Sequence, residues 1–301
     1  MSGRQRPALL LSVCGVAWAG LASAQAPLVH DTLTAGGLVR DFYVARPARV
    51  DSARGAPLVI FLHGGGGSAR GAAERYGFTG VAGGAGAIVV YPDGVDHHWN
   101  DGRDAFHSGD DVAFIRALVA RLRKQERIDP RRIYAAGHSN GAMMAYTLAC
   151  RAPGVFAAIG TVGGEIPVND VARCANAHPI SVIAIHGTDD PLVPYDGGGI
   201  RGAVLGAEQS ARFWSKVDGC AQTPTDTALP PPTRTDSTRA FLISYSDCRD
   251  ARAVVLYKIQ GAGHGWPGRP EMLPESVVGP HSDAVDATAV IWGFFVGNQR
   301  P

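Results

Sequence analysis

The stretch YAAGHSNGAMMAYTLAC, residues 134–150, contains the arrangement that decides the fold. An apolar run ends at Gly137, Ser139 stands between two glycines, and a run rich in Ala and Met follows with helical character. A G-x-S-x-G pentapeptide between a strand and a helix places its serine on a strained turn with the hydroxyl pointing outward. We expect a side chain at Gly137 or Gly141 to collide with the neighbouring strand or helix. In a chain with 39 glycines the pentapeptide alone is a weak signal, so its context matters.

Strand-like and helix-like runs alternate on both sides of this turn. Apolar runs that suit strands covered on both faces occupy residues 58–62, 88–91, 132–136, 180–186 and 253–259. Runs with helical spacing occupy residues 110–125, 143–149, 207–217 and 283–296. The alternation predicts an α/β fold with a mostly parallel central sheet and helices on both faces. Alternating apolar and polar residues over 32–44, around two glycines, predict an N-terminal β-hairpin.

The first 24 residues have the features of a secretory signal peptide. Arg4 and Arg6 precede the apolar run 8–21, and Ala22-Ser23-Ala24 is an A-x-A cleavage site. Residues 25–301 are then expected to form a single domain, with the polar, Pro-rich segment 221–240 as a surface insertion. The charge is nearly balanced, so we expect no nucleic-acid partner and no membrane partner after signal removal. The expected location is secreted or periplasmic.

Export places the remaining cysteines in an oxidising compartment, where they can pair. They are Cys150, Cys174, Cys220 and Cys248, and four cysteines allow three connectivities. The simplest hypothesis pairs sequence neighbours, Cys150 with Cys174 and Cys220 with Cys248, and the alternative is four buried thiols. The sequence has no C-x-x-C pair, so neither a zinc site nor a thioredoxin-type site has support.

A serine hydroxyl needs a base to act as a nucleophile at neutral pH. In strand–turn–helix hydrolases the acid and the histidine follow the serine along the chain. His264 lies in the Gly-rich loop KIQGAGHGWPG just after a strand-like run, and IAIHGTDDPLVPYDGG places Asp189 and Asp190 just after another. One of these aspartates would orient the imidazole. The three groups are therefore expected to meet at the carboxyl edge of the sheet.

The other histidines have less distinctive positions. His178 and His281 lie in polar loops and are expected at the surface, while His186 ends a strand and is expected to be buried, hydrogen-bonded and structural. His97, His98, His107 and Asp110 belong to a polar loop that precedes a helix, and we expect no metal and no cofactor there.

The loop LHGGGG, residues 62–67, is expected to stabilise an oxyanion. It resembles the H-G-G-G type of loop that donates a backbone N–H, and we assign Gly65 and the N–H of Asn140 as the two donors. A phosphate cradle is disfavoured because no Lys-Ser/Thr pair follows.

Three aromatic residues are assigned to substrate binding: Trp99, Trp266 and His63. The two indoles would line the cleft and suit a phenolic acyl group or a polyester chain. The alternative is that both tryptophans are packing residues.

The blocks LHGGGGSA, YPDG, WNDGR, DDVAFI, GHSNGAMMAY, HGTDDPLVPYDGG and GAGHGWPG together resemble the secreted polyhydroxybutyrate depolymerase and feruloyl esterase-like group of α/β-hydrolases. The likeness runs from about Leu58 to Trp292. It implies an α/β-hydrolase fold and ester cleavage through an acyl-enzyme, with Ser139 as nucleophile, His264 as base and Asp190 as acid. Members commonly have alanine where this chain has Asp189. The resemblance also supports the neighbour-wise disulfides.

The sequence therefore predicts a secreted serine esterase that acts on a small or oligomeric ester, such as a hydroxycinnamoyl (feruloyl) ester or a hydroxyalkanoate oligomer. The chain ends soon after its last expected helix, without room for a polymer-binding module, which favours soluble esters. Two alternatives remain open. One is a polyhydroxybutyrate depolymerase that acts on the polymer, and the other is a non-catalytic exported binding protein on a hydrolase scaffold.

Overall fold

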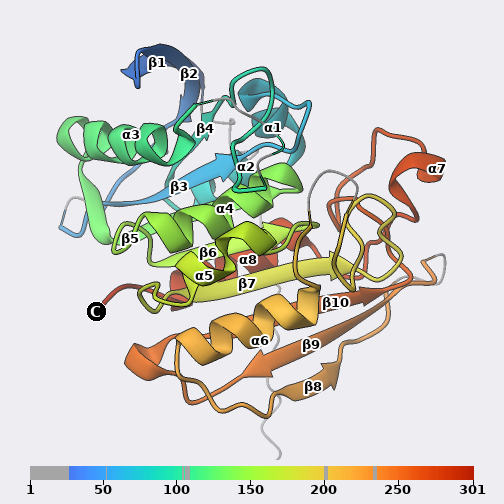
Figure 1. Ribbon diagram of the computed structural model, residues 1–301. Helices are drawn as coiled ribbons and strands as arrows, with labels where there is room; N and C mark the ends of the chain where they lie inside the picture. Colours follow the sequence, from blue (N-terminus) through green and yellow to red (C-terminus); the bar gives the residue numbers. More distant parts are fainter. Residues whose placement is uncertain (1–26, 52, 104, 106–108, 200–202, 233–235) are drawn as a thin grey trace, which may run out of the picture.

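The computed structural model describes residues 27–51, 53–103, 105, 109–199, 203–232 and 236–301, so the predicted signal peptide lies outside the described residues. One ten-stranded sheet forms the centre of the described chain (Figure 1), in the order β1-β2-β4-β3-β5-β6-β7-β10-β9-β8. The strands are β1 (Leu28–Ala35), β2 (Leu38–Ala45), β3 (Ala56–Leu62), β4 (Ile88–Pro92), β5 (Ile128–His138), β6 (Ala158–Val162), β7 (Ser181–Gly187), β8 (Thr225–Ala228), β9 (Arg239–Tyr245) and β10 (Val254–Gln260). The helices are α1 (Ala69–Arg75), α2 (Phe78–Gly84), α3 (Asp111–Gln125), α4 (Asn140–Arg151), α5 (Val171–Cys174), α6 (Ala207–Val217), α7 (Glu275–Val278) and α8 (Ala287–Gly297), with 3₁₀ turns at Val168–Asp170 and Arg249–Ala251.

The middle of the sheet is parallel and its two margins are antiparallel. Strands β4, β3, β5, β6, β7 and β10 run parallel to their neighbours in this row. The β1–β2 hairpin adds to β4 in the antiparallel sense, and β9 and β8 extend the other margin in the same way. The mostly parallel sheet and the N-terminal hairpin are confirmed. Strands β6, β8 and β9 were not predicted, because Gly160 and Thr161 interrupt the apolar run of β6, β8 is an exposed edge strand inside the segment 221–240, and β9 begins with Arg239 inside the same segment.

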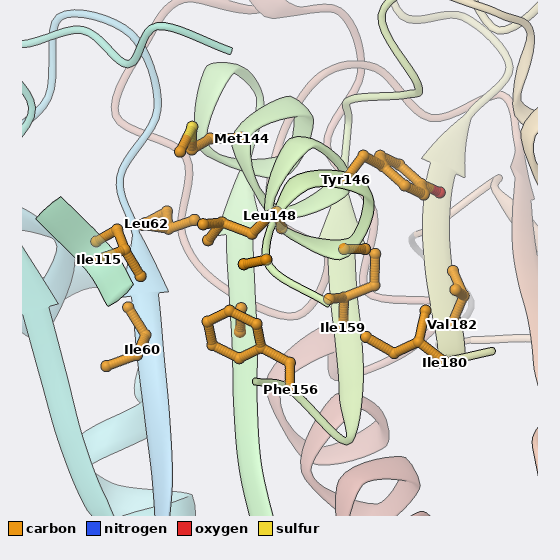
Figure 2. Close-up of a cluster of buried hydrophobic side chains, with 14 of the residues drawn as sticks. Ile60, Leu62, Ile115, Met144, Tyr146, Leu148, Phe156, Ile159, Ile180 and Val182 are labelled. Carbon is orange, nitrogen blue, oxygen red and sulfur yellow. The ribbon is translucent and has the colours of Figure 1, made fainter. Parts of the chain in front are cut away.

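Each parallel strand is buried on both faces, as its continuous apolar sequence predicts. In β3, Leu58, Ile60 and Leu62 belong to the apolar cluster that contains residues of α3, α4 and α6, while Val59 and Phe61 belong to the cluster that contains residues of α1, α2 and α8. Figure 1 shows α4 and α6 in front of the sheet and α8 behind it. Figure 2 shows how closely the side chains of α4 meet those of β3, β6 and β7 in the first cluster.

Both predicted disulfides are present. Cys150 at the end of α4 is bonded to Cys174 of α5, and Cys220 after α6 is bonded to Cys248. Each bridge closes a loop of fewer than thirty residues, with sequence separations of 24 and 28. In the part of the chain described, the helices are too short or too polar to cross a bilayer.

Candidate functional site

Ser139 lies on the sharp turn between β5 and α4. Its backbone has φ 55° and ψ −121°, a conformation that costs free energy for a residue with a Cβ and is typical of functional turns. An added Cβ at Gly137 would overlap the carbonyl oxygen of Gly141, and one at Gly141 would overlap that of Leu62. Both glycines are therefore required for the strand, turn and helix to approach each other, as predicted.

A continuous chain of contacts joins Ser139, His264 and Asp190. His264 Nε2 lies 2.8 Å from Ser139 Oγ, and His264 Nδ1 lies 2.6 Å from Asp190 Oδ2. An ionised carboxylate can only accept, so Nδ1 carries the ring proton and Nε2 is left to accept the hydroxyl proton. The three residues follow β5, β10 and β7, so the structure brings them together at one edge of the sheet as expected.

The Asp190 side chain is fully buried, and its carboxylate accepts hydrogen bonds on both oxygens. Oδ1 accepts from the backbone N–H groups of Leu192 and Val193, each at 2.8 Å. Burial by itself would raise the pKa of Asp190. The hydrogen bonds from His186 and His264 outweigh that effect and hold the pKa below its ordinary value. The carboxyl group therefore stays ionised at neutral pH.

The neighbouring aspartate points elsewhere. Asp189 is exposed, and its Oδ1 accepts a hydrogen bond of 2.8 Å from the Thr188 hydroxyl. Of the two aspartates, Asp190 is the one in contact with His264.

His138 occupies the first unspecified position of the G-x-S-x-G motif, and it supports the loop that carries His264. Its Nε2 lies 2.8 Å from the backbone oxygen of His264, which can only accept, so Nε2 donates. Nδ1 then accepts from the Tyr76 hydroxyl at 3.0 Å. Burial, and next the neighbouring His264, lower the pKa of His138 to about 3, so the ring is neutral. This role could not be predicted from the sequence because the motif leaves this position unspecified.

A second histidine lies on the far side of Asp190. His186 Nδ1 is 2.8 Å from Glu165 Oε1, and its Nε2 is 2.9 Å from the Val193 carbonyl oxygen and 3.3 Å from Asp190 Oδ2. The ring is buried and hydrogen-bonded, as predicted for His186. Its contact with Asp190 was not predicted. Glu165 was not predicted as a site residue, because it follows β6, whose short sequence lacks a continuous apolar run.

The glycine loop after β3 has two of its four N–H groups already engaged. Gly66 donates to the His97 carbonyl oxygen at 2.8 Å, and Gly67 donates to that of Gly64 at 3.0 Å. Gly65, the donor that the sequence predicts in this loop, is not one of these two engaged glycines.

These two glycines lie against the serine turn. A Cβ on Gly64 would be 3.5 Å from Ser139 Cβ, and one on Gly65 would be 3.6 Å from Asn140 Cβ. The N–H of Asn140 is the first of α4, a position where no earlier helical carbonyl is available as acceptor. The glycine loop thus lies against the turn that carries Ser139, with Gly65 beside Asn140.

Trp99 and Trp266 do not line an open cleft, which corrects the expectation that they contact substrate. Their exposed fractions are 0% and 1%. Trp99 Nε1 donates to the His63 carbonyl oxygen at 2.9 Å, and the N–H of Trp99 donates to Asn140 Oδ1 at 2.8 Å. Trp266 packs against Phe61 and other aromatic rings of the core. Both indoles are packing residues, and Trp99 ties the glycine loop to the start of α4.

His63 is also enclosed, and it holds backbone rather than facing the opening beside Ser139. Gly94 N–H donates to its Nε2 at 3.0 Å, so Nδ1 carries the proton and donates to the Gly64 carbonyl oxygen at 2.8 Å. Burial lowers the pKa of His63, which keeps the ring neutral. Its assignment to substrate binding does not fit these contacts, because both ring nitrogens are used within the protein.

Metal ligation finds no support in the described residues, where no group of three or more His, Cys, Asp or Glu side chains could hold an ion. His97 and His98 instead contact the backbone oxygens of Gly67 and Asp96. His107 lies outside the described residues.

Comparison with known proteins gives consistent results. Residues 42–194 match the family model described as "Esterase PHB depolymerase". NocK of Nocardia uniformis subsp. tsuyamanensis, provisionally named an esterase, is 30% identical over 271 residues, which cover 84% of this chain and 78% of NocK. Feruloyl esterase B of Piromyces equi is 30% identical over 191 residues, 60% of this chain and 34% of that protein. Feruloyl esterase C of Emericella nidulans is 31% identical over 166 residues, 53% and 58% of the two chains. This chain thus spans about a third of feruloyl esterase B and somewhat over half of feruloyl esterase C.

Among solved structures, acetyl xylan esterase from Aspergillus awamori superposes with a TM-score of 0.56 at 17% identity, covering 78% of this chain and 94% of that chain. At this identity the likeness concerns the fold alone, and it agrees with the α/β-hydrolase architecture.

Substituting Gly141→Ala should destabilise the protein by at least about 2 kcal/mol, because the added methyl group meets backbone that cannot move aside. The matched control is Gly293→Ala in α8, where an added Cβ has no neighbour within 4 Å. That variant should gain about 0.5–1 kcal/mol. Chemical denaturation of both variants checks the difference, and equal stabilities would contradict the packing described for the turn.

Substituting His138→Gln should change how stability depends on acid. The unfolded histidine takes up a proton as the pH falls below 6.5, while the folded ring stays neutral until a pH of about 3. As the pH falls through this window, the unfolding free energy of the wild type should therefore decrease more steeply than that of the variant. The difference between the two slopes should be about 1 kcal/mol per pH unit. Denaturation at pH 7, 5.5 and 4.5 measures the two slopes, and parallel curves would show that His138 is not held neutral.

Proposed function

The chain belongs to the esterase PHB depolymerase family, and from this premise we propose that it hydrolyses carboxylic esters through an acyl-enzyme formed on Ser139. The observation that carries the proposal is the contact chain from Ser139 Oγ through the His264 ring to Asp190. A hydroxyl, an imidazole and an ionised carboxylate in this order form the arrangement that activates a serine.

In the proposed reaction Ser139 Oγ attacks the ester carbonyl while His264 Nε2 accepts its proton. The tetrahedral intermediate collapses as His264 returns that proton to the leaving alcohol, which leaves the acyl group on Ser139. Water then repeats the sequence: His264 takes a proton from the water, the carboxylic acid departs, and Ser139 regains its hydrogen. Gly65 and Asn140 are proposed to donate their N–H groups to the oxyanion.

The environment of Asp190 supports this assignment of roles. Its carboxylate stays ionised, so it can stabilise the imidazolium that forms when His264 accepts the serine proton. It also fixes the tautomer, because Nδ1–H points to Asp190 and Nε2 points to Ser139. The Ser139 side chain remains partly exposed, which leaves the hydroxyl accessible to a substrate.

For the substrate we propose an ester with an apolar group, and a hydroxycinnamoyl ester first. Two of the relatives are named feruloyl esterases. Apolar side chains are exposed on the segments that follow Asp190 and His264: Leu192, Met272 and Leu273. These side chains, rather than the buried tryptophans, supply apolar surface for an aromatic acyl group. The two disulfides support an exported protein.

A fluorophosphonate probe should label Ser139 in the folded wild-type protein and fail to label Ser139→Ala.

The pair Asp190→Asn and Asp189→Asn is a matched test of the acid. The first should lower kcat by about 10³-fold or more, because a neutral amide no longer stabilises the imidazolium, and the second should retain nearly full activity. An unlabelled wild type would favour the non-catalytic binding protein, and equal losses at 189 and 190 would contradict the role of Asp190.

Among methyl ferulate, p-nitrophenyl esters of rising chain length and hydroxybutyrate oligomers, methyl ferulate should give the highest kcat/KM. Met272→Asn should raise KM for it about threefold through lost apolar contact, while Val39→Asn on the β2 hairpin should not. Both side chains are well exposed, at 78% and 66%. A preference for hydroxybutyrate oligomers would favour the depolymerase alternative, and an unchanged KM in Met272→Asn would remove that residue from substrate binding.

A further inference from the structure

A second histidine–carboxylate pair lies directly behind the proposed acid. Glu165 follows β6 and His186 lies near the end of β7. Both side chains are buried, and His186 lies between Glu165 and Asp190. The pair does not contact Ser139, and the proposed reaction does not use it. A buried charge without a partner is strongly unfavourable, so the charges of these buried groups must compensate one another.

The acceptors around His186 show how its ring is protonated. Nδ1 faces the Glu165 carboxylate at 2.8 Å, and Nε2 faces the Val193 carbonyl oxygen and the Asp190 carboxylate. A carbonyl oxygen and an ionised carboxylate only accept, so an ionised Glu165 requires both ring nitrogens to donate and the ring to be an imidazolium. The alternative places the proton on Glu165 and leaves His186 neutral.

We propose that Glu165 and His186 form a buried ion pair that positions Asp190 and keeps it ionised, and thereby sets the acidic limit of the esterase. The inference deepens the proposed function and rests on it for its kinetic consequence. Glu165 and His186 act through Asp190, so they are positioning residues. The charge state of His186 can nevertheless be tested without any substrate.

Behind Asp190, the charged groups closest to its carboxylate are His186 and Glu165. Of the described side chains, His264 and His186 face the Asp190 carboxylate, and Glu165 and Asp190 face His186. Burial disfavours the imidazolium, but the hydrogen bonds to Asp190 and Glu165 outweigh that effect and raise the pKa of His186 to about 10. The cation should therefore persist over the whole working range of pH.

Two phenols complete the surroundings of the pair. The Tyr146 hydroxyl donates to Glu165 Oε2 at 3.4 Å. The Tyr195 ring meets the His186 ring edge-on, with 5.8 Å between centroids, and the Tyr195 hydroxyl donates to Glu208, which also pairs with Lys258. Burial raises the pKa of both phenols, so neither carries charge at neutral pH. On the other side of His264, the His138 ring is neutral.

The ion pair has two consequences for Asp190. With His186 charged, the carboxylates of Glu165 and Asp190 are separated by a cation and both stay ionised, whereas a neutral ring would favour protonation of one of them. The cation also disfavours protonation of Asp190. Removing it should let Asp190 capture an inactivating proton at higher pH.

The first test observes His186 directly by nitrogen-15 NMR of protein labelled at histidine. In the wild type both ring nitrogens of His186 should show the nitrogen-15 chemical shifts of protonated nitrogen throughout pH 6–8. In Glu165→Gln the ring should be neutral or should titrate within this pH range. A neutral His186 at pH 7 in the wild type would overturn the proposal, whether or not any ester is hydrolysed.

The second test compares pH profiles of kcat/KM for His186→Gln and for His178→Gln, an exposed residue just before the other end of the same strand. His186→Gln should move the acidic limb up by about one pH unit and lower kcat about tenfold with little change in KM. His178→Gln should superimpose on the wild type. A lower amplitude with an unshifted limb would mean a merely structural role, and a wild type inactive on every ester would refute the proposed function instead.

If His186→Gln fails to fold, the wild type still allows a decision. A histidine whose folded pKa is about 10 against 6.5 unfolded contributes stability that is complete below pH 6.5 and is lost as the pH rises toward 10. The midpoint of denaturation should therefore fall over this window in the wild type, and the fall should be smaller in Glu165→Gln. Equal falls in the two proteins would contradict the ion pair.

Discussion

The geometry of the site depends on one buried carboxylate. Asp190 is almost completely removed from water, where burial alone would favour its protonated form. Its ionisation is maintained by Leu192 and Val193 N–H groups on one oxygen and by His264 and His186 on the other. This charge determines which nitrogen of His264 carries the proton, and that tautomer determines whether Ser139 has a base. The chemistry at the surface is thus set by hydrogen bonds that lie beneath it.

The groups around this carboxylate are held by backbone packed directly against backbone. A Cβ at Gly163 would be 3.2 Å from His264 Nδ1, and one at Gly187 would overlap the carbonyl oxygen of Ala262 in the loop that carries His264. The His264 N–H donates to the Val278 carbonyl oxygen at 2.5 Å. Main-chain contacts restrict the position of the imidazole more than flexible side chains could, and small residues at these positions make such contacts possible.

The fold and part of the site could be predicted from periodicity and from the order of residues along the chain. Continuous apolar runs such as that of β3 identify strands buried on both faces, and the glycines around Ser139 identify a turn that tolerates no side chain. Edge strand β8 was missed because its four exposed residues, three polar and one alanine, lack this pattern. Trp99 was misassigned because an indole is equally suited to a cleft and to a core, and sequence alone does not distinguish the two.

By itself the sequence determined the alternation of strands and helices and the short list of groups able to act on an ester, and it favoured the pairing of cysteines that lie close along the chain. Those features depend on local spacing, which the chain carries in one dimension. Only the tertiary structure decided that His138 holds the backbone of His264, and that Glu165 and His186 lie behind Asp190. Their contacts join residues from different strands of the sheet, and their protonation depends on burial and on partners, which exist only once the chain has folded.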